Sequence, residues 1–304
     1  MAISGQIDRR ENTNRYGLRN RYVFSGQLEM KTALHIGGGK ITLSSSDSPV
    51  VLTPEQQPFI PGSSFKGALR STIEKIVPGL PGFSSCALTD LSDKELEEAH
   101  ERGEKVCPTV RQREIAQLRR NPPKGKTAED ILDEAIGDLC DTCLLFGSPF
   151  AAARLNVSDL YMPDKEWSGI VQVRDGVAID RDTEKARDRL KYDFEVVPAS
   201  ATFNLEILLE NATKRDIQLL CVGLSEFVHG FGGVGGKRSR GLGVAQLNGL
   251  QVSALELFEE GVEQNEVSME QRRQRMRDYL LRKTFSNQVD GPVFLEAYIE
   301  DIFK

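Results

Sequence analysis

The chain has 304 residues, 39% of them hydrophobic, and a formal net charge of −6 at pH 7. This length and composition allow a sizeable core, so we expect one elaborated domain or two closely packed ones. No apolar run is long enough to cross a membrane, and the first ten residues lack the apolar core of a signal peptide, which predicts a cytoplasmic protein with no membrane partner. The acidic balance excludes a surface coated throughout by nucleic acid but allows a local basic groove.

The first quarter of the chain predicts an arm, a strand and a helix. Residues 1–20 are polar and predict a flexible N-terminal arm. Apolar and polar residues alternate over Tyr22–Leu34, which is typical of a half-buried strand. Apolar residues recur at helical spacing over Phe65–Ile76, with Ser63 or Ser64 as the expected N-cap.

Residues 79–143 form a proline- and charge-rich insertion, in which helices are expected over Asp93–Arg102 and Thr127–Asp138. Two thiolates in a Cys-x-x-Cys pair can occupy adjacent corners of a tetrahedron, and two further cysteines complete a structural zinc site. A segment this polar benefits from such a metal staple, so zinc is preferred to four unrelated buried thiols. The expected ligands are Cys86, Cys107, Cys140 and Cys143.

Two other residues bear on the zinc hypothesis. His100 could replace one cysteine as a ligand, although an exposed histidine on an acidic helix is the preferred interpretation. Cys221 lies on the apolar face of a later predicted helix and is expected in the core.

The second half of the chain returns to regular alternation. The predicted elements are strands over Ala153–Leu160, Gly169–Val173 and Ala201–Leu209, a helix over Lys214–Phe231, a strand over Leu242–Val252 and a helical extension from Ala254. The order β, α, insertion, β, β, α, β predicts an α+β fold of ferredoxin type, with helices on one face of an antiparallel sheet and the other face free for a ligand.

The segment from Arg174 to Pro198 is charged and balanced. One interpretation is a solvated hairpin. The other is a protruding arm that enters a partner or a nucleic acid duplex, with Ile179 as an apolar wedge. Phosphate contacts would then come from Arg174, Arg181 and Arg187.

Seven glycines interleaved with cations fill His229–Gly243. Such a run can be a flexible connector between a helix and a strand. The tight alternation favours phosphate binding, because glycines let backbone N–H groups approach a ligand and the cations favour a polyanion. The pattern is neither a Walker loop nor a dinucleotide fingerprint. The residues expected to bind are Gly235, Gly236, Lys237, Arg238 and Arg240.

Asp47 lies in a serine-rich loop before Ser48 and Pro49. An aspartate in this setting is usually a turn former. Beside a phosphate-binding face, its carboxylate could instead hold a divalent cation or take a proton from a ribose 2′-hydroxyl. His35 competes for the role of general base, although such a histidine is more often a packing residue.

Several of these segments together resemble the RAMP superfamily, and most closely the repeated backbone subunit of type III CRISPR effector complexes. The resemblance spans roughly residues 22–250. It is carried, in order, by Leu34–Gly39, Asp47–Val50, Ile60–Arg70, Cys143–Ser148, Gly176–Arg181, Phe194–Pro198 and His229–Gly243.

The resemblance implies a modified RNA-recognition-type fold whose copies stack along a guide RNA. Its core would comprise 21–78 and 144–252, interrupted by the insertion 79–143 and followed by the extension 253–304. A thumb hairpin at about 169–198 would displace a guide–target base pair at regular intervals. The insertion and the extension depart from the simplest family members.

The resemblance also assigns roles to residues. Asp47 would support cleavage of target RNA with Mg²⁺ or another divalent cation, making the chain an endoribonuclease. The glycine-loop cations and, on the first helix, Lys66 and Arg70 would neutralise guide phosphates. The expected partners are guide CRISPR RNA, target RNA, further RAMP copies, and the large polymerase-like and small subunits.

Two other functions stay open at this point. One is a structural RNA-binding backbone without cleavage activity. The other is a processing nuclease that cuts the precursor guide with His35 and His229 as an acid–base pair.

Overall fold

The computed structural model describes residues 17–38, 46–88, 92–103, 105–163, 167, 169–182, 184, 186–257 and 269–304. The expected N-terminal arm lies outside this description up to residue 16, as does the loop at 39–45.

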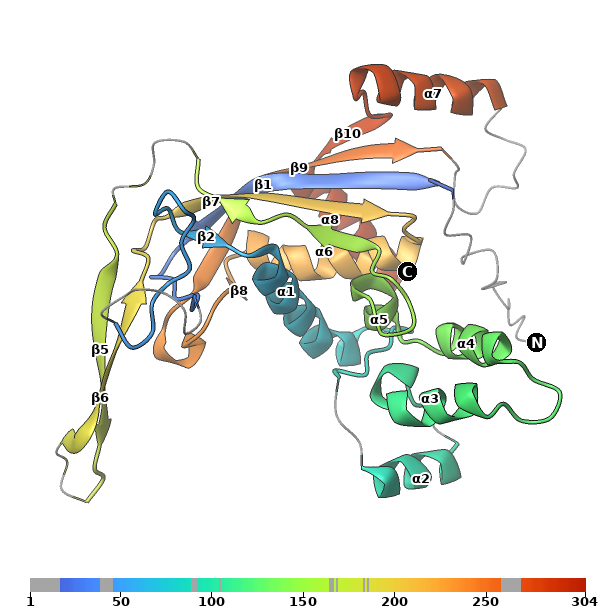
Figure 1. The fold of residues 1–304 in the computed structure, drawn as a ribbon. Helices are drawn as coiled ribbons and strands as arrows, with labels where there is room; N and C mark the ends of the chain where they lie inside the picture. The colour runs from blue at the N-terminus through green and yellow to red at the C-terminus, as the bar shows by residue number, and fades with distance from the viewer. Residues whose placement is uncertain are drawn as a thin grey trace.

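The main sheet is antiparallel, and its principal strands have the order β10-β9-β1-β7-β3 (Figure 1). A further short strand, β8, pairs with β9. The strands of this sheet are β1 (Asn20–Met30), β3 (Leu155–Val157), β7 (Thr202–Glu210), β8 (Gly232–Gly233), β9 (Val244–Glu256) and β10 (Asn287–Asp290).

The elements β1, α1 (Gly62–Ile76), β3, β7, α6 (Lys214–Val228) and β9 follow the βαββαβ order of a ferredoxin-type fold. The expected mixed α/β architecture with an antiparallel sheet is therefore confirmed. The core lies between the sheet and its helices, where Phe24 of β1 lies 5.7 Å from Phe294 of α8 (Gly291–Glu300), measured between ring centroids. Phe65 and Phe227 join α1 to α6 in the same layer.

The start of α1 differs from the prediction. Its N-cap is Pro61, and Ser63 and Ser64 lie inside the first turn without capping it. The Gly62 N–H instead donates to the Asp159 carboxylate at 2.7 Å. A contact with a distant loop, which sequence spacing does not reveal, sets this helix end.

The sequence predicted a helical C-terminal region, but the structure contains strand residues there as well. β9 continues to Glu256, and β10 pairs with it between α7 (Met269–Arg282) and α8. β10 has four mostly exposed residues, so no apolar alternation marked it. Tyr279 of α7 packs with Leu255 and Leu257, so α7 covers one end of the sheet face that was expected to be free (Figure 1).

The insertion carries the two expected helices, α2 (Asp93–Glu101) and α4 (Ala128–Gly137), together with α3 (Gln112–Arg120), which the sequence analysis missed. Ile115 of α3 packs with Ile131 and Ala135 of α4 in a small cluster. The insertion therefore has a minor core of its own. A short helix, α5 (Asp141–Phe146), follows and leads back to the sheet.

Two strands, β5 (Gln172–Ile179) and β6 (Ala186–Val196), form a separate hairpin that extends away from the main sheet (Figure 1). The strand expected over Gly169–Val173 thus begins and ends later than predicted. Gly176 faces Tyr192 across the hairpin, and a Cβ at Gly176 would lie 2.3 Å from the tyrosine ring. The glycine leaves room for this ring on the hairpin face. A smaller pair, β2 (Phe59–Ile60) with β4 (Leu160–Tyr161), completes the fold.

Candidate functional site

Four segments meet where the β5–β6 hairpin joins the body of the protein. They are the segment after β1 that carries His35, the loop 46–50, the part of the glycine loop that carries Lys237 and Arg240, and the end of β6. We call this meeting point the junction. Its residues are His35, Asp47, Ser48, Tyr192, Asp193, Phe194, Glu195, Lys237 and Arg240.

Asp47 and Asp193 bind each other reciprocally. The Asp47 N–H donates to the Asp193 carboxylate at 2.7 Å, and the Asp193 N–H donates to Asp47 Oδ2 at 3.1 Å. The Asp47 side chain is nevertheless exposed. The loop thus presents an exposed carboxylate in a defined position on the hairpin base.

His35 is buried, and both ring nitrogens have partners within the chain. Nδ1 lies 2.7 Å from the Glu195 carbonyl oxygen and Nε2 lies 3.3 Å from Ser48 Oγ. The His35 ring also meets Phe194 edge to face. These contacts support a packing role over that of a general base. His229, the other half of the proposed acid–base pair, is exposed, with Nδ1 2.7 Å from the Ser225 carbonyl oxygen.

Lys237 and Arg240 lie over the aromatic residues of β6. The Lys237 ammonium is 4.5 Å from the centroid of the Phe194 ring, and the Arg240 guanidinium is 5.5 Å from that of Tyr192. Arg240 also donates a hydrogen bond to the Tyr192 hydroxyl. Cation–π contacts of this kind hold the two positive charges against the base of the β5–β6 hairpin. A cation–π contact uses only part of each cationic side chain, so Lys237 and Arg240 still have N–H groups that can donate to an anion.

The glycines of this loop serve close packing of the backbone. Gly235 has a φ of +83°, and a Cβ there would lie 2.5 Å from the His35 carbonyl oxygen. The Gly236 N–H donates to that same oxygen at 2.9 Å, and the Gly243 N–H donates to Ala33. The Gly236 and Gly243 amides are therefore engaged within the chain. The sequence analysis expected Gly235 and Gly236 to face a phosphate, and for Gly235 this stays a prediction. The cationic groups of the loop are the side chains of Lys237, Arg238 and Arg240.

The two predicted RNA-binding cations of α1, Lys66 and Arg70, contact other residues than those of the junction. The Lys66 ammonium donates to the Leu155 carbonyl at 2.8 Å, and its burial lowers the pKa of Lys66. Arg70 pairs with Glu74 at 2.8 Å and donates to Cys143 Sγ at 3.3 Å. Both side chains are thus bonded within the chain, away from the residues that define the junction.

The remaining predicted RNA contacts lie on the hairpin. Arg174 is exposed on β5, and Arg181 is exposed just beyond the end of that strand. Ile179 belongs to β5, but its side chain and that of Arg187 are outside the described part of the structure. Val173 and Val177 are exposed apolar side chains on the same strand.

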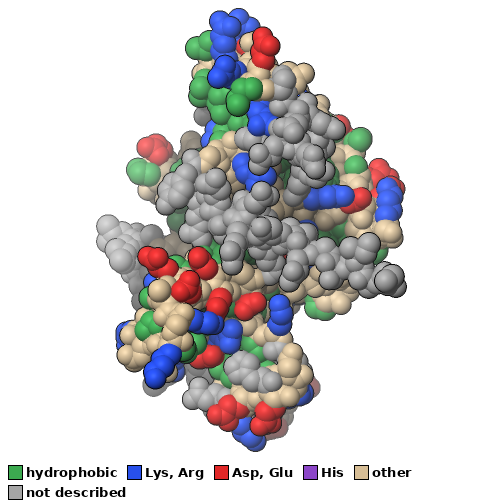
Figure 2. All heavy atoms as spheres, turned by 90° about the vertical axis from the view of Figure 1, so that its right-hand side faces the viewer, with side chains coloured by type: hydrophobic (Ala, Val, Ile, Leu, Met, Phe, Trp, Pro, Cys, Tyr) green, Lys and Arg blue, Asp and Glu red, His purple; other side chains and the backbone are tan. Residues whose placement is uncertain are grey.

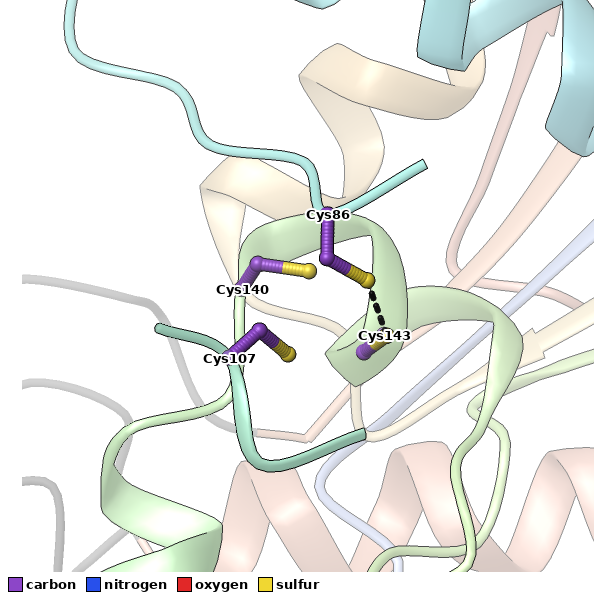
Figure 3. A group of neighbouring side chains, drawn as sticks. All are labelled: Cys86, Cys107, Cys140 and Cys143. Atoms are coloured by element: carbon purple, nitrogen blue, oxygen red, sulfur yellow. Dashed lines mark hydrogen bonds between the residues drawn. The ribbon is translucent and has the colours of Figure 1, made fainter. Parts of the chain in front are cut away.

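The four insertion cysteines converge (Figure 3). Their sulfur atoms all lie within 4.8 Å of one another, and those of Cys86 and Cys143 are 3.6 Å apart. A tetrahedral zinc ion with Zn–S bonds of about 2.3 Å requires sulfur atoms roughly 3.8 Å apart. The geometry therefore fits a closed metal site. Cys221 lies elsewhere, buried in α6 as expected.

Polar groups around the cysteines suit thiolates. Thr109 Oγ1 donates to Cys143 Sγ at 3.2 Å, in addition to the Arg70 guanidinium. Hydrogen bonds from Cys140 and Cys143 lower the pKa of Cys107, whereas those with Cys107 and Cys140 raise the pKa of Cys86. Four sulfurs packed this closely cannot all be thiolates without a cation, and a bound metal ion would supply it. The His100 side chain lies outside the described part.

Sequence reasoning missed the β6 half of the junction. The sequence analysis gave Tyr192, Asp193 and Glu195 no individual role. The contacts of Asp193 and Glu195 join positions about 145 residues apart, and Tyr192 meets Arg240, 48 residues away. The alternation of aromatic and acidic residues at the end of β6 was the available signal.

The βαββαβ sheet places the chain in the class of ferredoxin-type α+β proteins. The family model of the RAMP superfamily matches residues 27–246, and the chain belongs to that superfamily. In the described part of the chain, no helix has both the length and the apolar character of a membrane span.

Curated relatives match the chain over a short region. The CRISPR system Cms endoribonuclease Csm3 of Enterococcus italicus is 47% identical over 60 residues, which cover 19% of this chain and 28% of that protein. The protein of the same name from Methanothermobacter thermautotrophicus is 41% identical over 59 residues, 18% and 24% of the two chains. That from Streptococcus thermophilus is 43% identical over 56 residues, 17% and 26%. The matched region thus spans about a quarter of each relative.

Proposed function

We propose that this protein is a backbone subunit of a type III CRISPR effector complex, which binds guide RNA and cleaves the complementary target RNA. The superfamily match and the Csm3-named relatives support the class of complex. The observation that carries the site is the exposed Asp47 carboxylate, held against Asp193 of β6, the strand whose Tyr192 and Phe194 rings carry Arg240 and Lys237.

The chemistry needs few protein groups. The ribose 2′-hydroxyl loses its proton and its oxygen attacks the adjacent phosphorus. The P–O5′ bond breaks as the O2′–P bond forms, leaving a 2′,3′-cyclic phosphate and a 5′-hydroxyl that takes a proton from solvent. Positioning the nucleotide in line supplies much of the rate. In this proposal Asp47 receives or directs the 2′-hydroxyl proton, and the two junction cations face the phosphate.

The proposal assigns the hairpin to the role of the thumb. Its exposed Val173 and Val177, together with Ile179 as the expected wedge, would displace a base pair, while Arg174 and Arg181 contact phosphates. Guide–target pairing would determine the sequence that is cut, so the protein itself should show little base preference.

Two metal ions enter the proposal. Zinc at Cys86, Cys107, Cys140 and Cys143 would stabilise the insertion, and the sulfur geometry supports it. Among the described residues, Asp47 belongs to no group of three potential metal ligands. Asp47 would therefore bind a divalent cation together with the RNA phosphates, as proteins often bind Mg²⁺ through one or two carboxylates and substrate phosphates.

Asp47→Ala tests the proposal. In the assembled complex, cleavage of a complementary RNA should fall at least about 100-fold, since positioned acid–base groups contribute roughly 10²–10⁴-fold. Guide and target affinity should change less than about twofold, because one carboxylate adds little to a surface of phosphate contacts. Asp133→Ala, which removes an exposed aspartate on α4, is the matched control and should cleave normally.

Undiminished cleavage by Asp47→Ala would remove this residue from the mechanism and favour a structural backbone without activity. The role of a divalent cation requires a separate test, because EDTA can also strip zinc. Loss of cleavage in EDTA that Mg²⁺ alone restores would support coordination at Asp47.

A further inference from the structure

Phe231 is the most exposed large hydrophobic side chain in the described part of the chain, at 77% of its full accessibility. It lies just after α6, at the entrance to the glycine loop. Single exposed apolar residues are common on protein surfaces and need no explanation by themselves. Its backbone setting and its neighbours set Phe231 apart.

The backbone at Phe231 is firmly held. The Phe231 N–H donates to the Glu226 carbonyl at 2.8 Å, the Gly230 N–H donates to that of Phe227 at 3.2 Å, and Gly230 has a φ of +79°. These bonds form a Schellman motif, in which the residue at the Phe231 position frequently packs back against the last helical turn. Here the aromatic side chain points into solvent from a fixed support.

The next residue explains this orientation. A Cβ at Gly232 would lie 2.2 Å from the Phe227 ring, so this ring packs directly against the Gly232 backbone. Gly232 is also paired with Ala245 of β9. Gly232 therefore faces the core, and the adjacent Phe231 side chain points to the opposite, exposed side.

Cations flank the exposed ring along the chain. A Cβ at Gly233 would lie 2.9 Å from Arg238 Nε, so this guanidinium lies against β8, two residues from Phe231. Lys237 and Arg240 follow at the junction. An exposed aromatic ring in a loop that also carries cations is the combination that proteins use for single-stranded nucleic acid, with cations for phosphates and rings for bases.

We propose that Phe231 is a stacking platform for an unpaired RNA base at the entrance to the glycine loop. This inference rests on the proposed RNA-binding function and deepens it, because it adds a base contact to a surface otherwise defined by charge. Stacking tolerates any base, so the platform adds affinity without adding sequence preference.

The test compares oligouridine with an abasic ribose–phosphate chain of equal length, at several salt concentrations. The wild-type protein should bind oligouridine more tightly. Phe231→Ala should bind oligouridine about tenfold more weakly, the order expected for the loss of one stacked base, and should distinguish the two ligands less. Its salt dependence should match that of the wild type, since no cation is removed.

Three further variants separate the alternatives. Phe231→Trp should retain binding, whereas Phe231→Leu, which keeps an apolar side chain without a stacking face, should bind as weakly as Phe231→Ala. Phe303→Ala removes a 64% exposed phenylalanine next to the C-terminal residue, outside the glycine loop, and should have no effect. Unchanged thermal melting of the Phe231 variants would exclude misfolding.

The possible failures are distinct. If the wild-type protein binds neither ligand, the proposed RNA-binding function fails. If it binds RNA and Phe231→Ala or Phe231→Leu binds equally well, the stacking proposal is overturned while RNA binding stands. Normal RNA binding by Phe231→Ala with weakened self-association in sedimentation would make Phe231 a protein contact and overturn stacking as well.

Discussion

Asp47 and Asp193 each accept the other's backbone N–H, but they differ in exposure. The Asp47 side chain is exposed and could meet a ligand, whereas Asp193 is half-buried and its carboxylate fixes the loop through the Asp47 N–H. We infer that Asp193 positions Asp47 without taking part in proton transfer.

Substitutions of Asp193 test this division. Asp193→Asn keeps an oxygen that can accept from the Asp47 N–H and should cleave target RNA at nearly the normal rate. Asp193→Ala loses this hydrogen bond, which is worth about 0.5–1.5 kcal/mol, so cleavage should fall roughly two- to tenfold. Single-turnover cleavage with saturating target is the measurement. An equally large loss in both variants would show that the Asp193 charge itself is needed.

The individual residues differ in how far sequence could predict them. Spacing nominated Cys140 and Cys143, because a Cys-x-x-Cys pair carries its own geometry, and Cys86 and Cys107 were added because they lie in the same polar segment. Spacing could not show that Arg70 turns towards Cys143 and Glu74, since the direction of a long side chain depends on its tertiary neighbours. Its predicted role on guide phosphates therefore stays untested.

The glycine loop provides a matched pair of positions. Gly241 and Gly243 both have a φ of +79°, but only Gly243 is crowded, since a Cβ there would lie 2.0 Å from the Val234 carbonyl oxygen. Gly241→Ala should cost only the left-handed strain, about 1–2 kcal/mol. Gly243→Ala adds a clash with the backbone and should destabilise the protein substantially more. Chemical denaturation of both variants makes the comparison, and equal losses would contradict the close packing of this loop.

The insertion contains a small α3–α4 cluster and a group of four close cysteines, and the proposed zinc ion would add to its stability. The purified protein should carry about one zinc per chain by elemental analysis. Cys140→Ser should lose the metal and make the insertion sensitive to protease while the main sheet stays folded. Cys221→Ser changes a buried cysteine outside the cluster and should keep the metal. A fully folded, metal-free wild-type preparation would refute the zinc assignment.

Among the elements, alternation and helical spacing were reliable where one face is buried. β1, β7, α1 and α6 all overlap the expected ranges because their apolar faces meet a common core. The hairpin strands were harder to bound, since β5 is largely exposed and its sequence lacks a buried face. β10 was missed because pairing with β9 stabilises it and its own pattern does not.

The protein as a whole is acidic, so RNA binding should depend on a few local cations. Lys237, Arg238 and Arg240 are the best candidates. Log affinity for single-stranded RNA falls by about 0.7 per released counterion for each decade of salt. Replacing all three by Ala should therefore flatten the salt dependence by roughly two units and weaken binding to unrelated sequences equally.

The control removes the same number and types of charge from the insertion, whose surface carries both signs side by side (Figure 2). Arg119, Arg120 and Lys124 are exposed there, and their triple Ala variant should keep the wild-type slope. If both variants flatten the slope equally, RNA binding is diffuse and the glycine loop has no special part. A loss confined to particular sequences would make the loop a base reader.

The outermost strands of the main sheet are short. β3 has three residues and β10 has four, the latter ending in Asp290. Long, flat edge strands are templates for uncontrolled strand addition, and short or charged edges suppress it. The sheet is therefore a poor nucleus for amyloid-like growth, even at the high local concentration that a repeated subunit would experience. Copies that line up along an RNA would have to meet through loops, helices and the β5–β6 hairpin, which sets their spacing by side-chain fit and leaves the backbone ladders closed.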